Sequence, residues 1–407
     1  MSPTSVAPIF PIVGIALLSV YLISKLARMS GEKGHNAAID GLRGYLAFFV
    51  FLHHSFVWYF FLHYHKWGFP SFLIYGHFGP TSVALFFMIT AYLFFSKLLD
   101  AREGSIDWLK LYIGRFCRVF PLYIAVLVAL FIVVGFLSGF RLGEPVLRLL
   151  SNAGQWFLFI EPDLNGIDGT WMIIAGVTWS LAFEWLFYFS LVYLGWFFCK
   201  IKTPKRVLYI SGIFLFIFLG VIIYSYPGLG WQRISQFLGG IAAAIVTRHT
   251  TFKSWAASRQ TSILILLLMV IAIAFYPTIY EPLALGCMSI AFIGIAAGND
   301  LFGILSHRTA RLLGQVSYSI YLVHGLVLFV TFRFIIGFPR ASGLSPIAHW
   351  SVIAGCTIAL VSICTCTYLF IERPGIKAAS GITKRIKSFL QKSERLSPDA
   401  RCVKATI

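Results

Sequence analysis

Long apolar runs dominate the chain, and short polar segments separate them. A helix that crosses a bilayer needs about 20 mainly apolar residues. Eleven runs reach or approach this length, and charged residues are scarce inside them. The pattern predicts an all-α polytopic membrane protein with about 11 spans. These runs cover residues 8–27, 41–62, 78–99, 119–138, 178–199, 207–225, 232–247, 261–276, 283–298, 316–337 and 348–371.

A further apolar run at 146–160 is short and contains Arg148. It is either a partial or re-entrant segment or a twelfth span, and the charge of the connecting segments favours the first. Basic and non-basic segments alternate along the chain only if this run does not cross. The basic segments are 25–43, 97–118, 200–206, 248–259, 308–311 and 377–392.

The segment at 161–170 is the contrasting case, with Glu161, Asp163 and Asp168 and no Lys or Arg. Because positive loops stay in the cytoplasm, the alternation predicts a cytoplasmic C-terminus and an N-terminus on the outside. No Lys or Arg precedes Lys25, whereas a cleaved secretory signal begins with positive charge. We therefore expect residues 8–27 to be a retained span.

Three regions follow from this pattern. Residues 1–37 form an N-terminal transmembrane helix and a cytoplasmic linker, and residues 38–375 form the membrane domain. Residues 376–407 form a basic cytoplasmic tail, which is expected to lie along the anionic membrane face or to be disordered.

The composition agrees with a membrane protein. Of 407 residues, 58% are hydrophobic and 12% are charged, against about 25% charged in a soluble domain. The net charge of +18 would suggest nucleic acid as a partner of a soluble protein. Here the positive charge lies between apolar runs and no segment could form a soluble domain, so membrane lipids are expected as partners and nucleic acid is not.

Cysteine and histidine patterns do not indicate a metal site. The seven cysteines contain no CxxC pair and lie mostly in apolar runs, so we expect small packing residues. His63 and His65 are two residues apart and diverge on a helix, and no carboxylate is spaced to join them with His53 and His54. We expect no metal ligands in this chain.

One polar stripe in the second run is a candidate catalytic centre. Arg43 and His54 are eleven residues apart, which brings them to nearly the same helix face, about 16 Å apart along the axis. Arg43 would lie at the cytoplasmic end and His54 near the middle of the bilayer. An ionisable residue at that depth is costly and by default indicates function.

At these residues the sequence resembles the acyltransferase-3 family of integral membrane acyltransferases. That family begins with a DGLRG-like segment whose Arg is followed by ten residues and a His, as in residues 40–54. Further matches follow in order at residues 76–79 (GHFG), 85–89 (LFFMI), 115–123 (RFCRVFPLY), 178–188 (TWSLAFEWLFY), 314–324 (GQVSYSIYLVH) and 370–374 (FIERP). Directly after the segment at 85–89, Thr90 and Ala91 stand where the family usually has Ser and Gly.

The resemblance implies a ten-helix domain with both ends in the cytoplasm of a bacterial inner membrane, and the run at 8–27 is additional to it. It also implies an acyl-donor site for cytoplasmic acetyl-CoA at the cytoplasmic face. Arg guanidinium groups suit phosphate oxygens. The candidate donor-binding residues are Arg115, Arg118, Tyr123, Trp179 and Ser180.

His54 is the candidate general base, since an imidazole of near-neutral pKa can take the proton of an attacking hydroxyl. Arg43 and Glu184 are the other catalytic candidates. Glu184 could orient or share a proton with His54, or hold an arginine. His324 and Tyr318 are candidates for a supporting polar network. Glu372 is expected to pair with Arg373 or another arginine.

These expectations favour an O-acetyltransferase that moves acetyl from acetyl-CoA to a hydroxyl of a surface polysaccharide, lipopolysaccharide or lipid-linked sugar. No cofactor is expected to be bound permanently. The side from which the acceptor enters, the acyl group (acetyl or, for example, succinyl) and self-association into a homo-oligomer are left open. Rival hypotheses are a proton-coupled secondary transporter, which would show inverted repeats, and a non-enzymatic membrane partner with a degenerate site.

Overall fold

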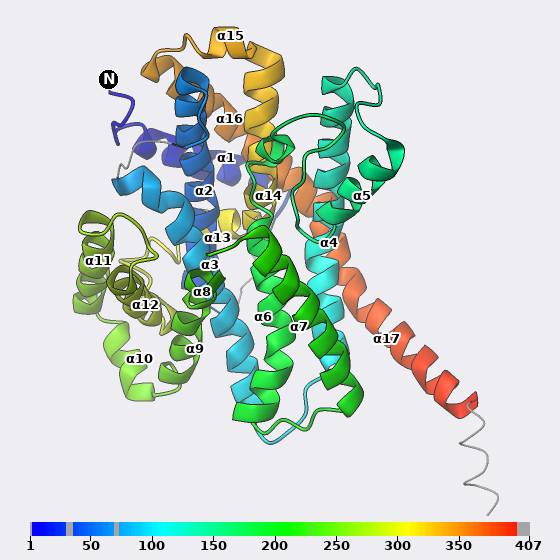
Figure 1. The fold of residues 1–407 in the computed structure, drawn as a ribbon. Coiled ribbons are helices and arrows are strands. Elements are labelled where there is room, and N and C mark those ends of the chain that lie inside the picture. The colour runs from blue at the N-terminus through cyan, green and yellow to red at the C-terminus, as the bar shows by residue number, and fades with distance from the viewer. Residues whose placement is uncertain (1, 30–35, 69–72, 229, 397–407) are drawn as a thin grey trace, which may run out of the picture.

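The computed structural model describes residues 2–29, 36–68, 73–228 and 230–396, and these residues form helices and loops without a β-strand. The prediction of an all-helical polytopic membrane protein is confirmed (Figure 1). Parts of two predicted regions, residues 30–35 of the linker and 397–407 of the tail, lie outside the described residues.

The first half of the chain contains α1 (Ile9–Leu26), α2 (Ala37–Tyr64), α3 (Leu73–Asp100), α4 (Trp108–Leu137), α5 (Val146–Trp156), the 3₁₀ helix η1 (Thr170–Ile174), α6 (Trp179–Phe198) and α7 (Lys205–Ser225). The second half contains α8 (Gly230–Ile234), α9 (Gln236–Val246), α10 (Thr250–Ala256), α11 (Arg259–Ala274), α12 (Pro282–Ala296), α13 (Arg308–Gln315), α14 (Ser317–Val330), α15 (Phe338–Ala341), α16 (Pro346–Thr367) and α17 (Arg373–Leu396). The π-helices η2 (Thr331–Ile336) and η3 (Tyr368–Glu372) extend α14 and α16.

Among the described residues, eight helices are long and apolar enough to cross a membrane, or nine if α10 and α11, which meet at a 77° bend, count as one span. The expected spans at 232–247 and 283–298 are shorter helices, α9 with 11 residues and α12 with 15. Arg233 near the end of α8 and Gln236 at the start of α9 interrupt the apolar run. Eleven residues of helix extend about 16 Å, roughly half of the hydrocarbon thickness.

The run at 146–160 forms α5, which also has 11 residues. A helix of 11 residues is too short to cross the bilayer, which supports the prediction of a partial segment. In Figure 1, α5 lies at the opposite end of the bundle from the free end of α17. We call these two ends the α5 end and the α17 end.

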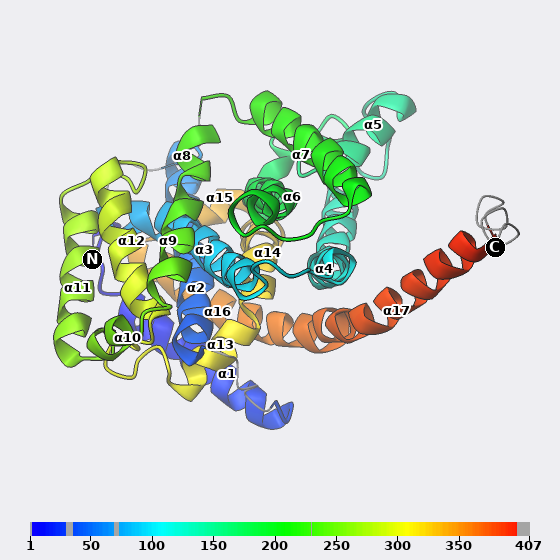
Figure 2. The same cartoon turned by 90° about the horizontal axis from the view of Figure 1, so that it is seen from below.

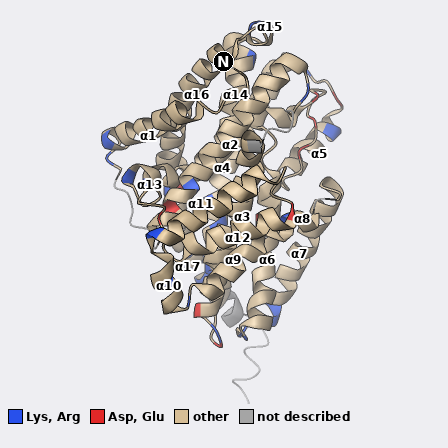
Figure 3. Ribbon diagram, turned by 90° about the vertical axis from the view of Figure 1, so that its left-hand side faces the viewer, with Lys and Arg blue, Asp and Glu red and all other residues tan. Residues whose placement is uncertain are grey.

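At the α17 end, an ion pair and a hydrogen bond join loops that are far apart in the sequence. Arg248 after α9 binds Asp100 at the end of α3, with Nη2 2.6 Å from Oδ1. Glu103 N donates to the Cys199 carbonyl at 3.0 Å, which joins the α3–α4 loop to the end of α6. Figure 3 shows Lys, Arg, Asp and Glu mainly toward the helix ends, as expected for helices whose middles face lipid.

Helix α2 lies in the centre and packs against α3, α13 and α14. Its first turn is capped by Asn36, whose side chain accepts from Ala38 N at 3.1 Å and donates to the Ala296 carbonyl at 3.2 Å. This pair of bonds ties the start of α2 to the end of α12. Glycine residues let α13 approach α2 closely. A Cβ at Gly44 of α2 would lie only 2.6 Å from Gly314 N of α13.

Helix α17 continues the chain of α16 through η3 and packs against α4 before leaving the bundle (Figure 2). Gly375 lies against the Cys117 carbonyl, and Lys387 Nζ is 2.5 Å from Asp107 Oδ2. The described part of the basic tail is therefore a helix whose first turns pack on α4.

The α2–α13 contact yields a test of bundle packing. A Cβ at Gly314 would overlap the Asp40 carbonyl oxygen, so Gly314→Ala must push the two helices apart. Such overpacking costs about 1–3 kcal/mol. We expect a lower thermal unfolding midpoint for the detergent-solubilised protein. The matched control is Gly355→Ala in α16, where a Cβ meets no atom within 4 Å. Equal midpoints for the two variants would contradict this account.

Candidate active site

A pocket of about 320 Å³ opens between α2, α3, α4, α6 and α14 in the part of the bundle nearer the α17 end. Apolar surface forms most of its wall, and eleven residues with charged or hydroxyl groups also line it. The polar lining residues are Arg43, Thr90, Lys97, Arg115, Arg118, Ser180, Glu184, Tyr188, Ser317, Tyr318 and Tyr321.

Positive charge gathers on one side of this pocket. Arg43, Arg115, Arg118 and Lys97 all line it, and they come from three different helices. The Arg115 guanidinium lies 4.9 Å from the centre of the Phe94 ring, which holds its side chain across the pocket wall. The predicted cluster of Arg43, Arg115 and Arg118 is thus brought together by the fold.

Glu184 is the acidic residue of the pocket. It accepts hydrogen bonds from Tyr188 at 3.1 Å and from Thr90 at 3.4 Å. The positive charges that act on it are those of Arg115 and Arg43. Among the described residues, Glu184 is hydrogen-bonded to Tyr188 and Thr90 and not to His54 or an arginine, so it shares the pocket with the arginines without forming an ion pair.

His54 instead contacts His324, with Nδ1 of His54 3.0 Å from Nε2 of His324. His324 lies fully buried on α14, and its Nδ1 is 3.0 Å from the Ile320 carbonyl. A carbonyl oxygen only accepts, so His324 Nδ1 carries the proton and its Nε2 has a lone pair. That lone pair can accept the Nδ1 proton of His54.

This arrangement fixes the tautomer of His54. Its Nδ1 lies 3.1 Å from the Val50 carbonyl as well as close to His324, and both neighbours accept. The proton therefore belongs on Nδ1, and Nε2 of His54 keeps a free lone pair. Among the described residues no hydrogen bond to this Nε2 is formed. His54 is thus prepared to receive a proton, and His324 orients it.

Tyr321 separates the pocket from the histidine pair. Its hydroxyl is 2.7 Å from Ser180 Oγ and donates to the Val177 carbonyl at 3.0 Å. Its ring centroid lies 6.3 Å from that of His324, three residues further along α14. The pocket lining includes Arg43 but not His54, so the two ends of the predicted stripe do not line one pocket.

Two candidate donor-binding residues lie outside the pocket lining. The Tyr123 hydroxyl donates to the Trp156 carbonyl at 2.5 Å and so ties α4 to the end of α5. The Trp179 ring lies under the Arg233 guanidinium at 4.1 Å from the ring centre. Both therefore contribute to the wall around the site and do not face the pocket.

Of the residues expected to support the site, Tyr318 lines the pocket and Glu372 does not. The Tyr318 hydroxyl donates to the Val119 carbonyl at 2.8 Å. Glu372 is buried on η3 and accepts from Ser319. Among the described residues Glu372 forms no ion pair, so its expected pairing with Arg373 or another arginine stays a prediction.

Sequence reasoning gave no role to Thr90, Lys97 or Tyr188, although all three line the pocket. Spacing could have indicated them. Tyr188 follows Glu184 by one helical turn, and Lys97 follows Thr90 by two turns, so each pair shares a helix face.

Glu161 is a further carboxylate, half-buried in the loop between α5 and α6. It accepts hydrogen bonds from Thr178 N at 3.0 Å and from Thr178 Oγ1 at 2.5 Å. Burial raises the pKa of Glu161 to about 7, against the opposing effect of these bonds. It fixes the loop to the residue that precedes α6.

With this geometry established, the comparison with protein families gives a clear result. The family model described as an acyltransferase domain, acyltransferase-3, matches residues 36–368. No curated protein and no solved structure gives a significant match. The family match and the long apolar helices together define a multi-pass membrane acyltransferase. The chain belongs to the acyltransferase-3 family.

The raised pKa of Glu161 predicts a pH effect on stability. A carboxyl whose pKa is higher in the folded protein binds more protons there, so stability falls as pH rises from about 4.5 to 7. Glu161→Gln keeps an acceptor for Thr178 without the charge. The thermal midpoints of both proteins are measured by unfolding in detergent. We expect the midpoint of Glu161→Gln minus that of wild type to be larger at pH 8 than at pH 5. A pH-independent difference would show that Glu161 does not titrate in this range.

Proposed function

We propose that this acyltransferase is an O-acetyltransferase that moves acetyl from cytoplasmic acetyl-CoA to a sugar hydroxyl of a surface polysaccharide, lipopolysaccharide or other glycan. The observation that carries the proposal is the arginine-lined pocket beside an oriented His54 with a free Nε2. Acetyl as the acyl group and a glycan as the acceptor rest on the family resemblance of the sequence.

The α17 end is proposed to face the cytoplasm of a bacterial inner membrane. It carries the basic segments at 97–118 and 200–206, and positive loops remain inside. Acetyl-CoA is made in the cytoplasm and carries several phosphate charges. A pocket with Lys97, Arg115 and Arg118 toward this end suits those charges.

The proposed reaction needs one base and no cofactor. Nε2 of His54 takes the proton of the acceptor hydroxyl while the hydroxyl oxygen attacks the thioester carbonyl carbon. The carbon–sulfur bond then breaks, and the proton passes from His54 to the departing sulfur. The products are the acetyl ester and free CoA thiol. His324 holds His54 in the required tautomer throughout.

Glu184 and the arginines act on the donor in this proposal. Glu184 offsets part of the positive charge of Arg115 and Arg43, which line the same pocket, and the guanidinium N–H groups are donors for phosphate or carbonyl oxygens. Tyr321 and Ser180 line the pocket on the side toward the histidine pair, and the acyl group of the donor is placed there in this proposal.

The transporter hypothesis makes a different prediction at the same residues. A proton relay through His54 and His324 would move substrate without consuming a thioester. Release of CoA thiol from acetyl-CoA by the purified protein therefore discriminates between the two functions.

Removing the proposed base should stop the chemistry. General-base groups contribute about 10²–10⁴-fold to rate, so we expect His54→Ala to lower CoA-thiol release by at least about 100-fold. His63→Ala is the matched control on the same helix, since His63 lies near the α5 end and its Nδ1 contacts the Tyr59 carbonyl. Both variants should elute as monodisperse protein. Full activity in His54→Ala would remove His54 from the mechanism.

The donor assignment has its own test. Arg118→Gln removes a charged donor of hydrogen bonds, worth about 1.5–3 kcal/mol, so the KM for acetyl-CoA should rise about 10-fold or more. Arg102→Gln removes a charge at the same end but outside the pocket lining, and it should leave KM near the wild-type value. Steady-state kinetics with acetyl-CoA as the varied substrate measure both. Equal effects would indicate a general attraction of the basic surface.

A further inference from the structure

A second pocket, of about 260 Å³, lies at the α5 end of the bundle. Aromatic rings of Trp58, Phe61 and Phe338 form part of its wall, and Asp168 and Arg333 bring opposite charges to it. None of these residues takes part in the donor pocket. The second pocket is therefore separate from the acyl-donor site.

The two charged groups are available to a ligand. Asp168 and Arg333 are exposed, and within the described part of the chain neither forms an ion pair or a hydrogen bond. The Arg333 guanidinium lies 5.0 Å from the centre of the Phe338 ring, which directs it along the aromatic wall. Arg333 also lies on the π-helix η2, a rare conformation that is frequent at functional sites.

A chain of aromatic ring contacts connects this pocket to His54. Trp58 follows His54 by one turn of α2, and its ring lies 5.5 Å from that of Trp67. The Trp67 ring lies in turn 6.4 Å from that of His54 and 5.3 Å from that of Trp171. One aromatic cluster thus borders both the pocket and the catalytic histidine.

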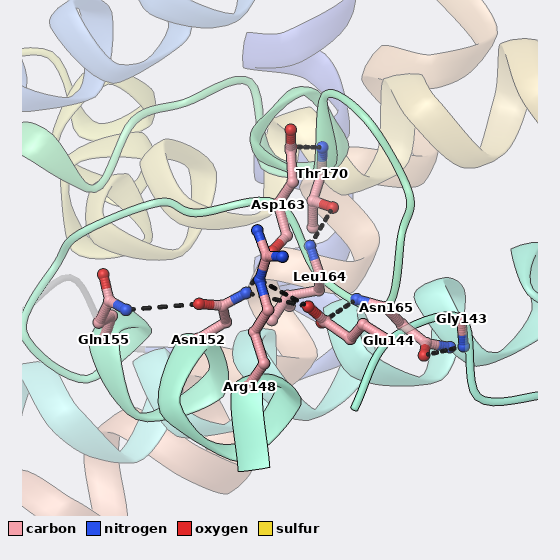
Figure 4. A network of polar contacts seen from close by, with 9 residues as sticks. All are labelled: Gly143, Glu144, Arg148, Asn152, Gln155, Asp163, Leu164, Asn165 and Thr170. Atoms are coloured by element: carbon pink, nitrogen blue, oxygen red, sulfur yellow. Dashed lines mark hydrogen bonds and ion pairs between the residues drawn. The ribbon is translucent and has the colours of Figure 1, made fainter. Parts of the chain in front are cut away.

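The loop that carries Asp168 is held in place by polar contacts (Figure 4). Glu144 accepts from Asn165 N at 2.6 Å, and Asp163 accepts from Thr170 N at 3.0 Å. Asn152 donates to the Asp163 carbonyl at 3.1 Å, which anchors the loop to α5. The pocket wall is therefore built on a fixed loop.

The same loop packs against the catalytic helix. Gly325 follows His324, and a Cβ there would overlap the backbone of Ile174 at the end of η1. The close approach fixes η1 beside the histidine pair. Groups bound by residues 167–173 are accordingly held near the site of proton transfer.

We propose that this pocket binds a sugar ring of the acceptor, which approaches from the side of the membrane opposite to the donor. A sugar has apolar C–H faces and a polar edge of hydroxyl groups. The aromatic rings suit the faces, Asp168 accepts from the hydroxyls, and Arg333 donates to them or to an acidic substituent of the glycan. This inference rests on the proposed function and names the acceptor side of that site.

The test separates acceptor binding from donor chemistry. Acetyl-CoA and each purified variant are combined with the glycan fraction extracted from a strain that lacks the gene, and acetyl incorporation is measured by mass spectrometry. CoA-thiol release without glycan is measured in parallel. For Asp168→Asn and Arg333→Gln, we expect the half-saturating glycan concentration to rise about 10-fold or more, while thiol release without glycan stays at the wild-type rate.

Glu281→Gln and Arg340→Gln are the matched controls, since both residues are exposed outside the pocket lining. These controls should match wild type in both measurements. Unchanged glycan dependence in Asp168→Asn and Arg333→Gln, or an equal loss of thiol release and transfer, would overturn the acceptor pocket while leaving the proposed function. If wild type releases thiol but transfers nothing to the glycan fraction, the glycan acceptor and the pocket assignment both fail.

Discussion

Polar groups in the interior of a bilayer have no water to bind, so each must find a partner within the protein. The polar centre of this bundle is arranged around that constraint. Tyr318 donates to Val119, Tyr321 to Val177, and His324 to Ile320, in every case through a backbone carbonyl. These bonds hold the side chains in fixed orientations. His54 is the member whose second ring nitrogen is left free, and its reactivity follows from the positions of the others.

Helix α14 connects the parts of the proposed machinery. Tyr318 and Tyr321 line the donor pocket, His324 orients His54, and the π-helix η2 that continues α14 carries Arg333 into the second pocket. In the proposed mechanism, donor and acceptor approach the histidine pair from opposite ends of the bundle. In this mechanism a charged cytoplasmic thioester reacts with a sugar that stays on the other side of the membrane.

Much of the fold could be predicted from hydrophobic periodicity, because lipid requires long apolar helices and tolerates few charges inside them. The prediction was less accurate where apolar runs contain polar residues or glycine. Arg233 and Gln236 divide one expected span into α8 and α9, and α11 meets α10 at a sharp bend. The individual site residues were predicted from motif order, but their partners were not. Glu184 accepts hydrogen bonds from Tyr188 and Thr90, and Trp179 lies beneath Arg233.

The sequence by itself determined the membrane class, the succession of helices, the acyltransferase family resemblance and the face shared by Arg43 and His54. Those properties depend on local periodicity and on motifs read in order. Only the tertiary structure decided that His324, 270 residues from His54, orients it. It also decided that Tyr321 lines the first pocket and contacts His324, and that Asp168 and Arg333 line one pocket. Contacts across such separations depend on how helices pack, and helix periodicity does not specify which faces meet.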